Sequence, residues 1–346
     1  MPRNTVYVVG AGASYELDLP VGNKLKEHIA KILYMSFEHG SFKDGNYDLY
    51  QTIRRHTGNN SSETNEYLKE CRHISNNMPL AISIDNFIDS ERGNDKLALC
   101  GKMAIVEAIL EAERKSKIFF ARYQGTEKIN FPRLENTWYL PFFRTLTENC
   151  RADDLQDRFR TITLVIFNYD RCIEHFLIHA LMSYYRLQER QAAEIVGSLK
   201  IIHPYGTVGS LPWQDQASST RMEYGGELQT QQLIEYAQRI RTFTEGAHSE
   251  HMDQLRHSMM HAERLVFLGF AFHRLNMELL MGATEDKYEN PLKIDCFATA
   301  FETSNNDQES ISASIKYLYK GEIKINIENT TCAMLFRDNS RSLGYA

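Results

Sequence analysis

An amide, a carboxylate and an imidazole lie directly after two apolar runs of the chain. Asn168 and Asp170 follow ITLVIF (162–167), and His203 ends LKIIH (199–203). Residues two apart in an extended segment point the same way, so Asn168 and Asp170 can face a sugar together. A histidine with a pKa near neutrality is suited to act as a general base toward water or a hydroxyl. These three are the candidate catalytic residues. The alternatives are a turn or helix cap for Asn168 and Asp170, and a core position for His203.

A glycine-rich loop ends the first apolar run, Thr5 to Val9. The loop consists of Gly10, Ala11, Gly12, Ala13 and Ser14. Glycines let backbone N–H groups approach an anion without a Cβ in the way, and Ser14 adds a hydroxyl, so the loop is a candidate phosphate cradle. The alternative is a tight turn that only joins a strand to a helix. Tyr15 leaves the dinucleotide fingerprint G-x-G-x-x-G incomplete, which disfavours an ordinary nicotinamide dehydrogenase.

Two further loops carry residues suited to ligand contact. Gly206 follows His203 within HPYG, and Gly269 lies in the apolar run RLVFLGF (264–270). Gly269 is expected to make room for a ligand. Asn276 either holds a polar ligand group or caps a helix.

The elements that must position these residues alternate between strands and helices. The expected strands are 5–9, 162–167, 199–203, 264–270, 292–298 and 322–327. They are continuous apolar runs, which is typical of a parallel sheet covered on both faces. Helices are expected from Pro20 to near Gly40, over 80–122, 137–149 and 171–187, through most of 228–262, near Met277 and over 308–320. The fold class is therefore α/β, a Rossmann-like parallel sheet, and ligands of such sheets bind at the carboxyl ends of the strands.

The expected domain organisation is one sheet domain with an insertion. Residues 1–40 and 151–346 form the Rossmann-like domain, and 41–150 form a mostly helical insertion. Residues 40–65 are rich in Gly, Asn, Ser and Thr, which predicts a loop.

Composition excludes several classes of protein. The net charge of −6 provides no general basic field for nucleic acid, so direct nucleic-acid binding is not expected. The six cysteines form no C-x-x-C pair, so neither a zinc site nor a disulfide framework is expected, and no metal is assigned. No apolar stretch approaches the length of a membrane span or a signal peptide. The expected location is the cytoplasm.

Four segments together resemble a known family. In chain order, VYVVGAGASYELDLPVGNKL, VIFNYDRCIEHFL, IIHPYGTVGSL and LVFLGFAFHRLN resemble the sirtuin-like NAD-consuming domains of bacterial antiphage defence. The resemblance implies that GAGAS binds the NAD phosphates, that Asn168 is the catalytic asparagine beside Asp170, and that His203 is the catalytic histidine. Gly206, Gly269 and Asn276, at the other strand ends, complete the expected NAD-binding residues.

The sequence departs from the deacylating sirtuins. Their zinc ribbon is missing, and Leu19-Pro20-Val21-Gly22 stands where they carry a Phe-Arg pair. Both differences favour simple cleavage of NAD, as substrate and without zinc, over protein deacylation. We therefore expect an NAD glycohydrolase that releases nicotinamide and ADP-ribose as a gated defence effector that depletes NAD. Whether water or the adenine reaches the ribose, giving hydrolysis or cyclisation, stays open.

The resemblance also implies partners. A homo-oligomer is expected, together with a separately encoded activator such as a HerA-type ATPase ring or a short Argonaute. Two rival interpretations are a regulatory subunit that binds NAD or ADP-ribose without turnover, and a scaffold that has kept only the fold.

Overall fold

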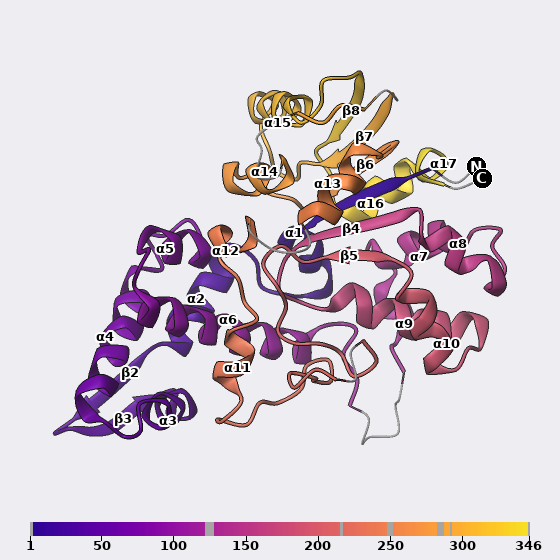
Figure 1. The fold of residues 1–346 in the computed structure, drawn as a ribbon. Helices are drawn as coiled ribbons and strands as arrows, with labels where there is room; N and C mark the ends of the chain where they lie inside the picture. Colours follow the sequence, from indigo (N-terminus) through magenta and orange to yellow (C-terminus); the bar gives the residue numbers. More distant parts are fainter. Residues whose placement is uncertain are drawn as a thin grey trace.

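A six-stranded parallel sheet forms the centre of the protein (Figure 1). The structure is a computed structural model that describes residues 3–121, 128–214, 217–247, 252–281, 287–290 and 293–344. Its strands are β1 (Thr5–Gly10), β4 (Ile162–Phe167), β5 (Lys200–Ile202), β6 (Arg264–Leu268), β7 (Ile294–Thr299) and β8 (Ile323–Glu328). They lie in the order β5-β4-β1-β6-β7-β8, and each pairs in parallel with its neighbours. The expected α/β, Rossmann-like fold is confirmed.

The central strands are buried on both faces, as their continuous apolar sequences predict. All residues of β1 and β4 are buried. Val6 and Val8 of β1 belong to one hydrophobic core, and Tyr7 and Val9 belong to a second core on the opposite face. This division follows from the two-residue period of a strand.

Helices cover both faces of the sheet. Those before β4 are α1 (Ala11–Ser14), α2 (Asn23–Ile32), α3 (Tyr47–His56), α4 (Ser61–Asn77), α5 (Ile84–Ser90), α6 (Asp95–Lys115), α7 (Tyr139–Thr147) and α8 (Leu155–Phe159). Those after β4 are α9 (Cys172–Tyr185), α10 (Glu189–Val196), α11 (Leu233–Ala237), α12 (Phe243–Ala247), α13 (Met252–Met260), α14 (Arg274–Met281), α15 (Asn305–Tyr317), α16 (Cys332–Asp338) and α17 (Ser340–Leu343). Single 3₁₀ turns occupy Tyr15–Leu17, Phe131–Leu134 and Ala152–Asp154.

The segment 40–65 is not a loop, and that expectation was wrong. It contains strand β3 (Ser41–Gly45), which pairs in an antiparallel hairpin with β2 (Met35–Glu38), then α3 and the start of α4. Two of the polar residues that suggested a loop are helix caps. The side-chain oxygen of Asn46 accepts from Leu49 N at 3.0 Å, and that of Asn60 accepts from Ser62 N at 3.0 Å. Asparagine is a strong N-cap, so local composition resembled a loop where helices begin.

The helix expected from Pro20 to near Gly40 is α2, which ends at Ile32, and the expectation was wrong for Met35–Glu38, which form the strand β2. The other expected elements differ mainly in length. The described residues of the span 228–262, which was expected to be mostly helical, form the short helices α11, α12 and α13. Residue 122, residues 248–251 and residue 292, which fall in expected elements, lie outside the described residues. Among the helices that the structure describes, none combines the length and apolar character needed to cross a membrane.

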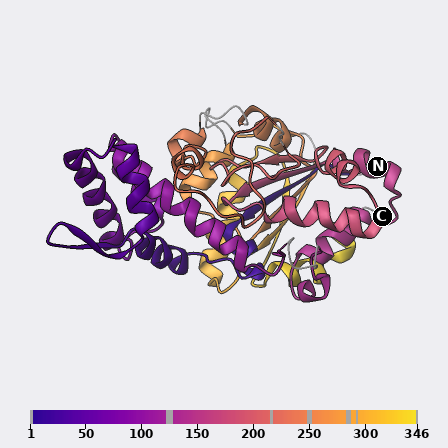
Figure 2. The same ribbon diagram turned by 90° about the horizontal axis from the view of Figure 1, so that it is seen from below.

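The residues of 41–150 form two parts, one that projects away from the sheet and one that packs against it (Figures 1 and 2). Helices α3, α4 and α5, with the β2–β3 hairpin, project to one side of the sheet in both views (Figures 1 and 2). Helix α7 instead packs against the sheet, where the ring of Phe142 lies 5.2 Å from that of Tyr7. Nearby, Trp138 Nε1 donates to the carbonyl oxygen of Ala13 at 3.0 Å. The long helix α6 runs from the projecting helices to the helices that pack against the sheet (Figure 2).

Candidate active site at the carboxyl edge of the sheet

The strand order has one switch point in the sheet. From β1 the chain builds β4 and β5 on one side and β6, β7 and β8 on the other, so the topology reverses between β1 and β6. Ligands of open parallel sheets bind outside the carboxyl ends of the strands at such a switch point. GAGAS is not the loop expected from the sequence, because Gly10 ends β1 and Ala11–Ser14 form the one-turn helix α1. The segments at the switch point are therefore α1, after β1, and the loop that begins at Gly269, after β6.

Three candidate residues meet in a buried hydrogen-bond cluster at the ends of β1 and β4. Ser14 Oγ donates to Asp170 Oδ2 at 2.7 Å, and Asn168 Nδ2 donates to Ser14 Oγ at 3.2 Å. Asn168 Nδ2 also donates to Asp170 Oδ2. All three side chains are buried. Ser14 is thus brought to Asn168, from which it is separated by 154 positions in the sequence. This is what the shared edge of the strand ends predicts.

Asp170 organises this cluster and also contacts the start of helix α9, whose N-cap residue is Arg171. Its Oδ1 accepts from the backbone N–H of Cys172 at 3.0 Å, at the start of α9. The sequence left capping and ligand contact as alternatives for Asp170, and the geometry shows a contact with the helix start. Burial raises the pKa of Asp170, although the hydrogen bonds from Cys172 and Ser14 oppose this shift. Both carboxylate oxygens hold protein donors, so Asp170 acts here by fixing Ser14 and Asn168.

His203 lies beside this cluster, with both ring nitrogens engaged. Nδ1 lies 3.2 Å from the carbonyl oxygen of Asn168, and Nε2 lies 2.8 Å from Glu174 Oε1 on α9. Burial lowers the pKa of His203, but the charge and hydrogen bond of Glu174 raise it more, so the net pKa is above its ordinary value. The imidazole is therefore close to Asn168, as expected, but it is bonded to a carboxylate that the sequence analysis did not include.

The glycines at the ends of β1 and β6 pack directly against each other. A Cβ on Gly12 would lie 2.7 Å from the carbonyl oxygen of Gly269, and one on Gly10 would lie 2.5 Å from the same oxygen. Gly12 N donates to this oxygen at 3.0 Å. Gly269 has φ of +54°, and its own Cβ would lie 2.1 Å from Ala13 N. These glycines are therefore required by the contact between the loops, whatever the loops bind.

Gly206 and Asn276 have protein partners of their own. Gly206 has φ of +73°, and its N–H donates to the carbonyl oxygen of His203 at 3.0 Å, which closes the turn after β5. Asn276 Oδ1, on α14, accepts from the hydroxyl of Tyr205 at 2.6 Å. The loops after β5 and β6 are thus joined across the edge of the sheet. Neither residue contacts the Ser14–Asn168–Asp170 cluster through a hydrogen bond that the structure describes.

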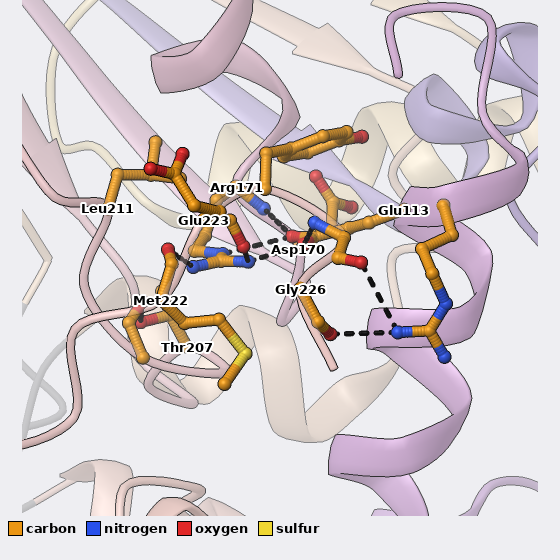
Figure 3. A network of polar contacts seen from close by, with 12 residues as sticks. Glu113, Asp170, Arg171, Thr207, Leu211, Met222, Glu223 and Gly226 are labelled. Carbon is orange, nitrogen blue, oxygen red and sulfur yellow. Dashed lines mark hydrogen bonds and ion pairs between the residues drawn. The ribbon is translucent and has the colours of Figure 1, made fainter. Parts of the chain in front are cut away.

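A buried ion pair holds α6 against the start of α9. Arg171 Nε donates to Glu113 Oε1 at 3.0 Å, and their side chains are 1% and 0% exposed (Figure 3). Arg171 Nη1 also donates to the carbonyl oxygen of Met222 at 2.8 Å, while Gly225 N donates to Glu113 Oε2 at 2.8 Å. This network ties three separate segments together next to Asp170, and so it fixes the backbone from which Asp170 projects.

The insertion contributes a carboxylate near the same edge. The hydroxyl of Tyr169 donates to Asp85 Oδ1 on α5. Burial raises the pKa of Asp85 to about 6, with the hydrogen bond from Tyr169 opposing the shift. Helix α5 therefore contacts the residue between Asn168 and Asp170.

Sequence reasoning missed Glu174, Arg171, Glu113 and Asp85. A usable signal exists for Glu174, because it is an acidic residue in the apolar stretch CIEHFLIHAL, where each residue from 172 to 178 is buried. Glu113 lies in the similarly apolar helix α6 and is also buried. Charged residues are almost never fully buried unless they are paired. Their partners, however, are distant in the sequence and come only from the fold.

Cavities large enough for a nucleotide lie elsewhere in the described part of the chain. One of about 1100 Å³ is bordered by α7, α9 and α16, and one of about 570 Å³ by α2 and α4. None of the candidate residues lines either cavity. Within the described part of the chain, no three His, Cys, Asp or Glu side chains gather so that they could hold a metal ion.

Comparisons with known proteins do not identify a family. No protein-family model matches the chain, and no curated protein sequence matches it. The resemblance to sirtuin-like domains therefore stays a prediction, and the functional argument depends on the geometry of the site.

Proposed function

We propose that the protein is a sirtuin-like NAD glycohydrolase that cleaves the bond between nicotinamide and ribose. The observation that carries the proposal is the meeting of Ser14, Asn168 and Asp170, with His203 beside them, at the carboxyl edge of a sheet in Rossmann strand order. These residues come from the ends of three strands. Polar side chains that converge at this edge are the usual arrangement for binding a nucleotide in such a sheet.

The proposed reaction needs no acid to assist the leaving group. The C1′–N bond of the ribose breaks, and its electron pair neutralises the cationic nicotinamide ring. A water oxygen bonds to C1′ through a transition state that resembles the oxocarbenium ion of glycoside hydrolysis. The water proton passes to His203 and then to solvent, so the products are nicotinamide, ADP-ribose and one proton.

Each residue then has a distinct task. Asn168 orients the ribose or the attacking water, and Asp170 holds Asn168 and Ser14 in place. The GAGAS segment, at the switch point, binds the pyrophosphate. His203 serves as the base once an Nε2 lone pair is free. In the present arrangement these groups bond to one another, so NAD binding requires the cluster to open.

We further propose that this activity is gated, because unrestricted NAD loss would kill the host cell. An oligomeric assembly or a separately encoded activator would supply the trigger. The antiphage context comes from the sequence resemblance alone.

The test is NAD loss and nicotinamide release by the purified protein, with and without the product of the neighbouring gene. We expect Asn168→Ala and His203→Ala to abolish turnover. The matched controls are Asn306→Ala and His261→Ala, both at exposed positions, and we expect them to leave turnover unchanged. Turnover that survives Asn168→Ala would overturn the proposed site.

A second candidate function is binding of NAD or ADP-ribose without turnover. The engagement of both ring nitrogens of His203 favours it, because an imidazole in that state removes no proton. Calorimetry that detects NAD binding, combined with no nicotinamide release under any condition, would select this second function.

A further inference from the structure

Glu174 is a buried carboxylate beside the proposed base. It lies in the first turn of α9 with its side chain 2% exposed, and its Oε1 is 2.8 Å from Nε2 of His203. Its other oxygen, Oε2, is buried and has no hydrogen-bond partner among the residues that the structure describes. A carboxylate in this position is stabilised mainly by one neighbour, His203, because burial without pairing is costly.

The positions of the protons on His203 follow from its two contacts. The carbonyl oxygen of Asn168 can only accept, so Nδ1, at 3.2 Å, carries a proton. At 2.8 Å, the contact between Nε2 and the carboxylate of Glu174 also requires a proton between the two atoms. In this conformation neither ring nitrogen offers a free lone pair, and His203 is unable to accept a proton from water.

The surrounding charges favour the imidazolium form. Glu174 from α9 faces His203, and the carboxylate of Asp170 adds a weaker effect in the same direction, so the pKa of His203 is raised despite its burial. Arg171 is the nearby cation, but its guanidinium is bonded to Glu113. On the α7 side, burial raises the pKa of Tyr139 and the charge of Glu174 adds to that shift, so this phenol stays neutral.

We propose that Glu174 is a positioning residue that holds His203 as a protonated ion-pair partner, and that opening of this pair releases the base for NAD cleavage. The inference rests on the proposed function. It identifies the pair of Glu174 and His203 as the place where the activity is gated. The resting enzyme is inactive because its base is already protonated. The unpaired Oε2 leaves the carboxylate incompletely satisfied, which makes the pair easier to open than a fully bonded one.

The decisive variant is Glu174→Gln, which keeps the size of the side chain and removes its charge. We expect the pKa of His203 to fall, because burial then acts with less opposition. Each unit of that fall raises the fraction of unprotonated imidazole about tenfold, as long as the pH is below the pKa. We therefore expect NAD cleavage by Glu174→Gln without any activator, at a rate at least tenfold above that of the wild type.

Two controls separate this effect from a structural one. Glu189→Gln makes the same chemical change at an exposed position of α10 and is expected to leave both the His203 titration and the rate unchanged. The double variant Glu174→Gln/His203→Ala is expected to lose the gained activity, because the gain acts through the imidazole.

The measurements are an NMR titration of histidine side chains and the rate of nicotinamide release as a function of pH. The His203 signals are identified by their absence from His203→Gln. A wild-type His203 that titrates below about 6.5, the ordinary pKa, overturns the proposal without needing any variant. A His203 titration that is equal in wild type and Glu174→Gln also overturns it.

The rates distinguish this proposal from the proposed function. Wild-type NAD cleavage that Asn168→Ala abolishes, with no gain in Glu174→Gln, overturns the gating role alone. Absence of NAD cleavage in every variant at every pH overturns the proposed function and the gating role together.

Discussion

Replacing Glu113 by glutamine removes the carboxylate that forms an ion pair with the buried guanidinium of Arg171. Both side chains are essentially without solvent contact, so water does not compensate for the lost charge. Removing one partner of a buried ion pair costs about 3–5 kcal/mol. For a chain of 346 residues the entropy of unfolding at the melting temperature is about 0.7 kcal/mol/K, so we expect Glu113→Gln to lower the melting temperature by about 4–7 °C.

A double-mutant cycle tests the origin of this cost. Arg171→Met alone leaves the Glu113 carboxylate buried with its backbone donors, Arg171 N and Gly225 N. Combining Arg171→Met with Glu113→Gln removes both charges, so the double variant should be less destabilised than the sum of the two single variants. Recovery should be incomplete, because the buried carbonyl oxygen of Met222 loses its donor, at about 1–3 kcal/mol, and the partly exposed carbonyl oxygen of Glu223 also loses a donor.

The assay is urea unfolding followed by circular dichroism, with Glu194→Gln as the control. Glu194 forms an ion pair with Arg190 on the surface of α10, where both side chains are more than half exposed. Such i,i+4 pairs contribute about 0.2–0.5 kcal/mol. A loss for Glu113→Gln that is no larger than the loss for Glu194→Gln would refute the argument that this buried pair holds α6 to the start of α9.

Two other predictions concern the neighbouring loops. Gly269→Ala should destabilise the protein by several kcal/mol more than Gly58→Ala, because both glycines have φ near +60° but only the Cβ at 269 meets backbone atoms; equal losses by urea unfolding would contradict the loop contact. The raised pKa of Asp85, about 6 against 3.8, makes its stabilising contribution complete below pH 3.8 and lost as the pH rises through about 6, a change of about 3 kcal/mol. Asp85→Asn should therefore flatten the fall in stability between pH 4 and 6.5, and an unchanged slope would show that Asp85 is not buried as described.

These predictions concern contacts that surround the cluster of Ser14, Asn168 and Asp170. The ion pair of Glu113 with Arg171 fixes the backbone at Asp170, and the contact of Gly12 with Gly269 fixes the first loop. Weakening either one should also reduce NAD binding, if the proposed function is right, because Ser14 and Asn168 are held by these two supports.

The sequence alone determined the sheet. Strands with continuous apolar character, such as Ile162–Phe167, were recognisable because a parallel strand buried on both faces has no polar side to interrupt it. The placement of Ser14, Asn168, Asp170 and His203 near one another also followed from the sequence, because the carboxyl ends of parallel strands share one edge. Local polar composition misled the interpretation of 40–65, since Asn46 and Asn60 are as suitable for capping a helix as for forming a loop.

Only the tertiary structure decided what these residues bond to. The partners Glu174 and His203 are separated by 29 positions, and Glu113 and Arg171 by 58. No periodicity or motif specifies such pairs, because they depend on how α6, α9 and the segment after β5 pack together in the fold. Only the tertiary structure also explains why Gly10 and Gly12 are glycines. The backbone of Gly269 occupies the space that a side chain at either position would need. Residue types and strand ends therefore predicted that the candidate residues lie together, while long-range packing set the hydrogen bonds that they form.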